Sequence, residues 1–134
     1  MDLAALRPGL QGDAKLVVAE QHTAPRVGSG RVHVLATPVM INLIEAAALA
    51  AVEHLLPQGY QSLGTVLNVR HIAATPVGMQ ATAVARLVKV EGRTLSFEVS
   101  CRDEKDLIGD GTHERVVVNV AKFDERVQRK LSKA

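Results

Sequence analysis

The sequence predicts an α+β domain in which an antiparallel sheet curls around one long, alanine-rich helix. Two observations indicate this class. One apolar helical segment covers about Pro38 to Leu56, and four segments with the alternating pattern of strands follow it, joined by short turns. The 134 residues suit a single domain, 1–134, and an apolar content of 47% excludes a disordered chain.

The helix carries the strongest local signals. Thr37 is a suitable N-cap, because its hydroxyl can accept a free backbone N–H of the first turn. Pro38 suits the first helical position, where its missing N–H has no effect. Pro57 and Gly59 end the segment. We therefore expect about five helical turns, apolar on nearly every side and buried.

The segment before the helix is expected to contain one strand. Met1–Asp13 resembles a loose leader, and Lys15–Thr23 is the first strand. Pro25 and the Gly28–Gly30 segment break it.

After the helix, the alternation of apolar and polar residues predicts four strands and a short basic helix at the C-terminus. Glycines 109 and 111 suggest a β-bulge in the last strand. The expected strands are Leu63–Ile72, Met79–Val90, Thr94–Cys101 and Leu107–Val120. A sheet of this kind leaves an open edge, for which dimerisation is a common remedy, so we expect a homodimer.

Charge and composition exclude several classes of function. A net charge of +2, from 16 basic and 14 acidic residues, is too balanced for a nucleic-acid surface. Cys101 is the only cysteine, which excludes an internal disulfide and is compatible with a cytoplasmic location. The longest uninterrupted apolar run, Ala46–Val52, is too short for a membrane helix, and no secretory signal is recognised. The histidines lack the spacing of metal ligands, so we expect neither metal nor cofactor.

Three residues stand out as candidates for chemistry: Thr37, Glu45 and His71. Glu45 lies mid-helix among apolar residues. It either belongs to a narrow solvent-facing stripe or is a partly desolvated carboxylate that acts as base or nucleophile. Thr37 precedes it by about two turns and can share its side of the helix. For Thr37 alone a plain cap is the simpler interpretation, and a lone histidine such as His71 is more often structural.

Several motifs together resemble the fluoroacetyl-CoA thioesterase family of hot dog proteins. They are Ala36-Thr37-Pro38-Val39-Met40, the helix with Glu45, Gly64-Thr65-x-x-Asn68-Val69-x-His71-x-Ala73-Ala74-Thr75-Pro76-x-Gly78, Val90-Glu91-Gly92-Arg93 and Gly111-Thr112-His113-Glu114-Arg115. The resemblance covers about residues 32 to 123.

This resemblance implies a hot dog fold and a homodimeric acyl-CoA thioesterase with its sites at or near the subunit interface. The family's catalytic threonine, glutamate and histidine fall on Thr37, Glu45 and His71, and its substrate-contacting glycine and arginine on Gly64 and Arg115. In the family, the glutamate attacks the thioester or directs hydrolysis, the threonine hydroxyl orients it, and the histidine handles protons.

Alternatives remain at the level of the sequence. A dimer that binds acyl-CoA or another small molecule without hydrolysing it is the main one, and a hydratase is another. The family's fluoroacetate enzyme has phenylalanines in a lid before the helix, whereas Gly28–His33 contains no aromatic residue of that kind. We therefore expect low selectivity for fluoroacetyl-CoA. His113 and Glu114 either shape the pocket beside Arg115 or are ordinary polar residues of an edge strand, and we favour the second interpretation.

Overall fold

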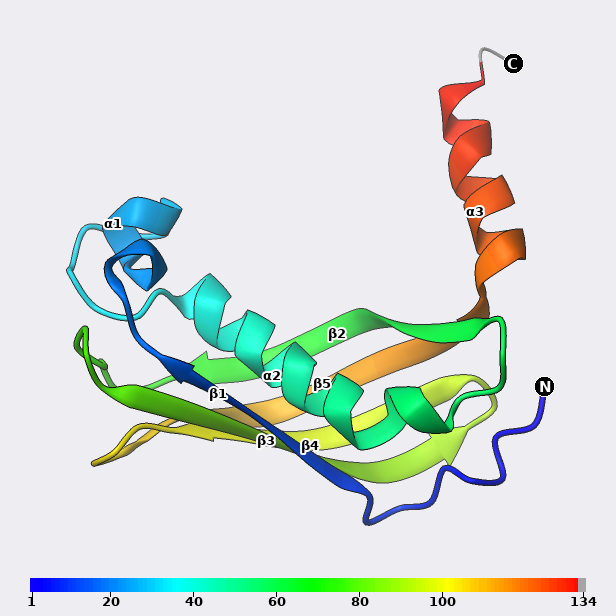
Figure 1. The fold of residues 1–134 in the computed structure, drawn as a ribbon, viewed down its shortest axis with the longest axis horizontal. Helices are drawn as coiled ribbons and strands as arrows, with labels where there is room; N and C mark the ends of the chain where they lie inside the picture. Colours follow the sequence, from blue (N-terminus) through cyan, green and yellow to red (C-terminus); the bar gives the residue numbers. More distant parts are fainter. Residues whose placement is uncertain (133–134) are drawn as a thin grey trace.

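The computed structural model describes residues 1–132 as one curled sheet around a central helix (Figure 1). The strands are β1 (Gln11–Val17), β2 (Tyr60–His71), β3 (Gln80–Glu91), β4 (Thr94–Arg102) and β5 (Leu107–Asn119). The α-helices are α1 (Ala24–Val27), α2 (Thr37–Val52) and α3 (Val120–Gln128). Three short 3-10 helices complete the fold: η1 (Glu20–His22), η2 (Glu53–Leu55) and η3 (Arg129–Leu131).

The five strands form one antiparallel sheet in the order β1-β3-β4-β5-β2. Helix α2 lies in the hollow of this sheet, while α3 projects from the end of β5 (Figure 1). The predicted fold class is therefore confirmed. Strands β1 and β2 are the two edges of the sheet. Strand β2, which follows α2 in the chain, therefore has one side without a partner strand.

The core is aliphatic and depends on close approach of backbones. One face of α2 is buried, including Ile44, Ala47 and Ala51. Strand β1 crosses that helix so closely that a Cβ on Gly12 would lie 2.4 Å from the carbonyl oxygen of Ala47. Small residues on the helix and a glycine on the strand thus allow the two backbones to pack in direct contact.

The predicted first strand, Lys15–Thr23, is wrong in its limits. The strand starts at Gln11, inside the expected leader, and pairs with β3 from Gln11↔Arg86 to Val17↔Gln80. Residues 20–27 instead form η1 and α1, where Pro25 occupies the first turn and therefore needs no N–H partner. Long-range pairing with β3, rather than local pattern, sets the strand's position.

The start of α2 also differs from the prediction. Ala36 precedes the helix, Thr37 is its first residue, and the Thr37 side chain caps no backbone N–H. The regular helix ends at Val52 and is followed by η2, so it is shorter than predicted. By length and composition the stretch Thr37–Leu55 is apolar enough to cross a membrane, which the apolar-run argument overlooked. In this fold it is the core helix.

Two irregularities shape the strands that flank the site. Thr65 is an extra residue where β2 changes register against β5, so the expected alternation from Leu63 to His71 is interrupted. Ile108 is extra where β5 changes register against β4, directly before Gly109, close to the bulge that the glycines predict. The predicted terminal helix is present as α3, which starts directly after β5 with the Asn119 side chain accepting from the Lys122 N–H.

Candidate active site

Thr37 and His71 are brought together by the fold. Thr37 opens α2 and His71 ends β2, and Thr37 Oγ1 lies 2.7 Å from His71 Nδ1. Burial lowers the pKa of His71 below its ordinary value, so the imidazole is neutral at pH 7. Its Nε2 is buried without a hydrogen-bond partner among residues 1–132. The hydroxyl that the sequence assigns to a helix cap therefore holds a neutral imidazole.

A cavity of about 360 Å³ lies beside this pair. Thr37 and His71 line it together with residues of the loop before α2, among them Val32, and of the segment after β2, among them Ile72. No Phe, Tyr or Trp of residues 1–132 contributes to its lining. The space next to the imidazole is therefore lined mostly by aliphatic residues, with Arg31 as its charged residue.

Glu45 lies on α2 with one third of its side chain exposed, and it pairs with Arg115 of β5. The distance from Arg115 Nη1 to Glu45 Oε2 is 3.2 Å, and the arginine side chain is 6% exposed. A carboxylate in this position is held by a charge that has little water around it. It is therefore fixed in orientation rather than free on a solvent-facing stripe.

Gly64 leaves room for that carboxylate. A Cβ built on Gly64 would lie 2.4 Å from Glu45 Oε2 and 3.2 Å from His113 Cε1. Any side chain there would displace Glu45. Gly64 thus lines the cluster through its lack of a side chain, next to the arginine with which it pairs in the sheet (Gly64↔Arg115).

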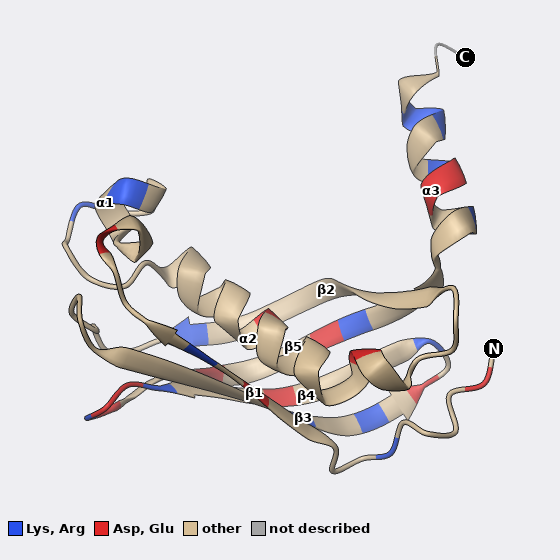
Figure 2. Ribbon diagram, in the orientation of Figure 1, with Lys and Arg blue, Asp and Glu red and all other residues tan. Residues whose placement is uncertain are grey.

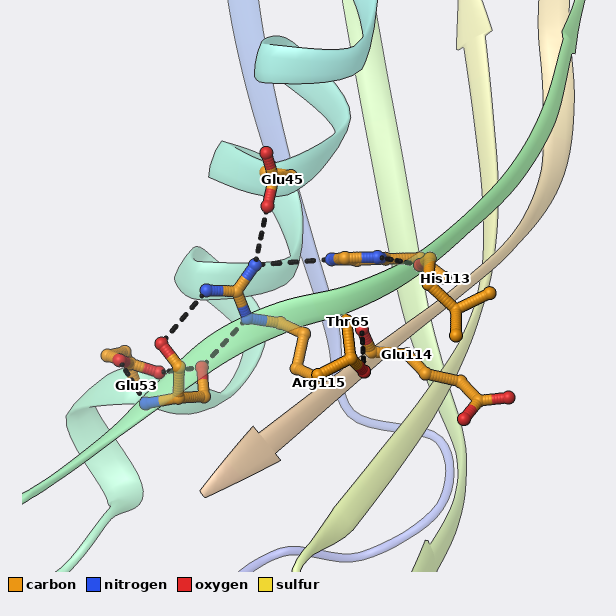
Figure 3. Close-up of polar contacts among 8 residues, drawn as sticks. Glu45, Glu53, Thr65, His113, Glu114 and Arg115 are labelled. Carbon is orange, nitrogen blue, oxygen red and sulfur yellow. Dashed lines mark hydrogen bonds and ion pairs between the residues drawn. The ribbon is translucent and has the colours of Figure 1, made fainter. Parts of the chain in front are cut away.

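Arg115, which Figure 3 shows with its contacts to Glu45 and His113, is itself held by Ser62 and, through Ser62, by Glu53. Arg115 donates from Nε to Ser62 Oγ at 2.8 Å and from Nη2 to the Ser62 carbonyl at 3.0 Å. Ser62 in turn donates from its hydroxyl and its N–H to the two oxygens of Glu53, at 2.6 and 2.9 Å. Two carboxylates therefore flank one buried guanidinium.

His113 completes the cluster, and its interpretation as an edge-strand residue is wrong. Strand β5 lies between β4 and β2, and His113 is fully buried and stacked on Phe97. Its Nδ1 lies 2.7 Å from the Val66 carbonyl, and its Nε2 lies 3.2 Å from Arg115 Nη1. Because both partners fix the tautomer, Nδ1 donates and Nε2 accepts. Burial lowers the pKa of His113, which keeps the ring neutral.

The five candidate residues thus form two groups within one chain. Thr37 and His71 make the first, and Glu45, Gly64 and Arg115 make the second. No hydrogen bond joins the groups within residues 1–132. Thr37 and Glu45 are eight positions apart on α2, about 12 Å along its axis. In this chain the Thr37 hydroxyl contacts His71 and not Glu45.

Ser62 and Glu53 are neighbours of this cluster that sequence reasoning did not assign to it, and His113 is one that it weighed but did not favour. Glu53 follows Glu45 by eight positions and His113 precedes Arg115 by two, so both spacings were local signals, whereas Ser62 reaches Arg115 only through the β2–β5 register. One further signal was present: Ser62 and His113 both lie on the strands that carry Gly64 and Arg115.

Cys101 and metal ligands do not contribute to this site. Burial raises the pKa of the Cys101 thiol to about 11, so it is not a thiolate nucleophile at neutral pH. Within residues 1–132, no three His, Cys, Asp or Glu side chains are grouped so that they could hold a metal ion.

Comparison with known proteins identifies the family. The model of the fluoroacetyl-CoA-specific thioesterase family matches residues 18–121. The chain is 47% identical over 97 residues to the fluoroacetyl-CoA thioesterase of Streptantibioticus cattleyicolor, covering 72% of this chain and 70% of that protein.

Solved structures agree with this match. A variant of the fluoroacetyl-CoA-specific thioesterase in complex with fluoroacetate and CoA is 40% identical, covers 88% of this chain and 99% of its own, and superposes with a TM-score of 0.81. A thioesterase superfamily member from Thermus thermophilus is 29% identical, covers 98% of this chain and 97% of its own, and has a TM-score of 0.90. The chain therefore belongs to the fluoroacetyl-CoA-specific thioesterase family, a family of thioester hydrolases with the hot dog fold.

Proposed function

We propose that this protein hydrolyses a short-chain acyl-CoA thioester at a site formed by Thr37, Glu45 and His71, with Gly64 and Arg115 contacting the substrate. The observation that carries this proposal is the Glu45 carboxylate, one third exposed in a largely apolar helix and held by the buried Arg115. Such a carboxylate is oriented for chemistry and only partly hydrated.

The Glu45 group and the Thr37–His71 pair have different roles in the reaction. Glu45 either attacks the thioester carbonyl carbon or takes a proton from the water that attacks it. In both routes the C–S bond breaks, the leaving thiolate takes up a proton, and water supplies the oxygen of the released carboxylic acid. The neutral imidazole of His71, held by Thr37 at 2.7 Å, takes up the proton that the water loses, and the resulting imidazolium gives this proton to the CoA thiolate.

A homodimer brings the two groups to one substrate. The outer side of β2 has no partner strand, and Leu63, Val66 and Leu67 are exposed along it. Antiparallel pairing of two β2 strands about a two-fold axis near Leu67 would put Gly64 beside the partner's His71. A single thioester would then contact Glu45 of one protomer and the Thr37–His71 pair of the other.

Mixed dimers test this arrangement. When the Thr37→Ala and Glu45→Gln chains are co-expressed, random assembly gives one intact shared site in half of the dimers. We expect about a quarter of the wild-type activity per chain, with each variant alone nearly inactive. A co-expressed sample that shows only the sum of the two variants would mean that each site lies within one chain or that no dimer forms.

An acyl-CoA panel with a thiol-reactive dye tests the activity itself. Release of CoA should be fastest for short acyl groups, and fluoroacetyl-CoA should have no large preference over acetyl-CoA, because no Phe, Tyr or Trp of residues 1–132 lines the cavity beside His71. The buried Cys101 adds little background, which a sample without substrate measures. Binding without release would favour the alternative, a non-catalytic acyl-CoA-binding dimer. A free cysteine also suits a cytoplasmic protein.

A further inference from the structure

A basic groove lies at the base of α3, away from the catalytic candidates. Its volume is about 330 Å³. Tyr60 and Asn119, which face each other in the sheet, form its floor, and Arg93, from the turn between β3 and β4, contributes a wall. The α3 and η3 segment contributes the remaining basic residues, which are Lys122, Arg126 and Arg129.

The positive charge of this groove is not neutralised within residues 1–132. None of its four basic side chains forms a salt bridge there, and Glu125 is the only acidic residue in the lining. Figure 2 shows basic positions on α3 and at the turn between β3 and β4, the two segments that contribute basic residues to the lining of the groove. Four unpaired cations around one hollow attract a ligand with several negative charges.

The groove is aligned with the Glu45 cluster. The pair Tyr60↔Asn119 lies four positions from the pair Gly64↔Arg115 on the same two strands. Even spacing places both pairs on the face of the sheet that carries α2, about 13 Å apart at 3.3 Å per residue. Ser62 lies between the two pairs on this face and is buried under its bonds to Glu53, so a ligand with its reactive end at Glu45 reaches the groove past Glu53 and not over Ser62.

We propose that this groove binds the phosphate groups of the nucleotide end of CoA, while the flexible pantetheine arm spans the distance from the groove to Glu45. The inference rests on the proposed function for the position of the thioester. The 3′-phosphate and the pyrophosphate supply the multiple negative charge, and Tyr60 offers a ring for the adenine. The groove thus selects CoA thioesters over thioesters that lack the nucleotide.

Substrates with and without the nucleotide test whether the groove binds it. In the Arg93→Ala/Arg126→Ala double variant, the KM for acetyl-CoA should rise about fivefold to tenfold with kcat nearly unchanged, as expected for two lost ionic contacts. The KM for acetyl-pantetheine, which lacks the nucleotide, should not change. Arg86→Ala, at an exposed arginine of β3 outside the groove, is the control and should alter neither KM.

Direct titration separates this inference from the proposed function. Adenosine 3′,5′-bisphosphate should bind the wild-type protein in calorimetry, more weakly as salt increases, and bind at least fivefold more weakly to the double variant and to Lys122→Glu. Equal KM changes for both substrates, or unchanged nucleotide binding in the variants, would overturn the proposal that the groove binds the nucleotide end of CoA. If the wild-type protein hydrolyses no thioester, the proposed function fails, and the titration still decides whether the groove binds the nucleotide.

Discussion

Arg115 has polar partners on three sides, and Ser62 fixes the orientation of its guanidinium. Ser62 accepts from Nε with its hydroxyl and from Nη2 with its carbonyl, and Glu45 takes Nη1. The Ser62 hydroxyl also donates to Glu53, so a single oxygen links the guanidinium to a second carboxylate. We infer that Ser62 is a positioning residue for the pair of Arg115 and Glu45.

Replacing Ser62 by Ala should therefore lower kcat by about tenfold, because one hydrogen bond to a charged group contributes about 1.5 kcal/mol and Glu45 loses its fixed partner. Steady-state kinetics should show the loss in kcat more than in KM, and Ser62→Thr should restore much of it. Ser100→Ala on β4 is the matched control. An unchanged kcat, or an equal loss in both serine variants, would remove Ser62 from the site.

At the scale of elements, the contact between β1 and α2 shows what sequence patterns miss. The helix could be predicted because Thr37, Pro38, Pro57 and the apolar run between them are local signals. The first strand was misplaced because it is specified by pairing with β3 and by the space that Gly12 leaves against α2. The same limit applies to the site: Glu45 and Arg115 are 70 positions apart, and only the folded register makes them partners.

Gly12→Val should destabilise the fold by about 2 kcal/mol or more, since its Cβ would overlap backbone atoms of Ala47 and Ala51, which cannot move aside as a side chain can. Chemical denaturation of the purified variant measures the free energy of unfolding. Gly30→Ala is the control, because a Cβ there meets nothing closer than 3.5 Å. Equal stability of the two variants would mean that β1 does not lie as closely on α2 as described.

At the scale of the whole molecule, two histidines link stability to pH: His113 is buried and His71 is half-buried. Burial lowers the pKa values of His71 and His113 below the ordinary 6.5. Below pH 6.5 the unfolded chain therefore binds more protons than the folded one, and stability falls as the pH falls towards the folded pKa values. Above pH 6.5 this contribution is constant. Asp103 and Asp110, whose pKa values are lowered from 3.8, add a separate loss at more acidic pH.

Urea denaturation should consequently give a lower midpoint at about pH 5.5 than at about pH 7.5. His71→Asn removes one of the two groups, so the difference between the two pH values should shrink in this variant. A midpoint that does not change between these pH values would contradict the lowered pKa values of the two histidines.

The function of the whole molecule depends most directly on Glu45. The measurement that decides it is kcat for Glu45→Gln with the best acyl-CoA of the panel, since Gln keeps the shape and removes the charge. A general base or nucleophile typically contributes about 10²–10⁴ in rate, so kcat should fall at least about a hundredfold. The fold should persist, as thermal melting would show. A variant that keeps nearly full turnover would contradict the catalytic role of Glu45 and favour a protein that only binds its ligand.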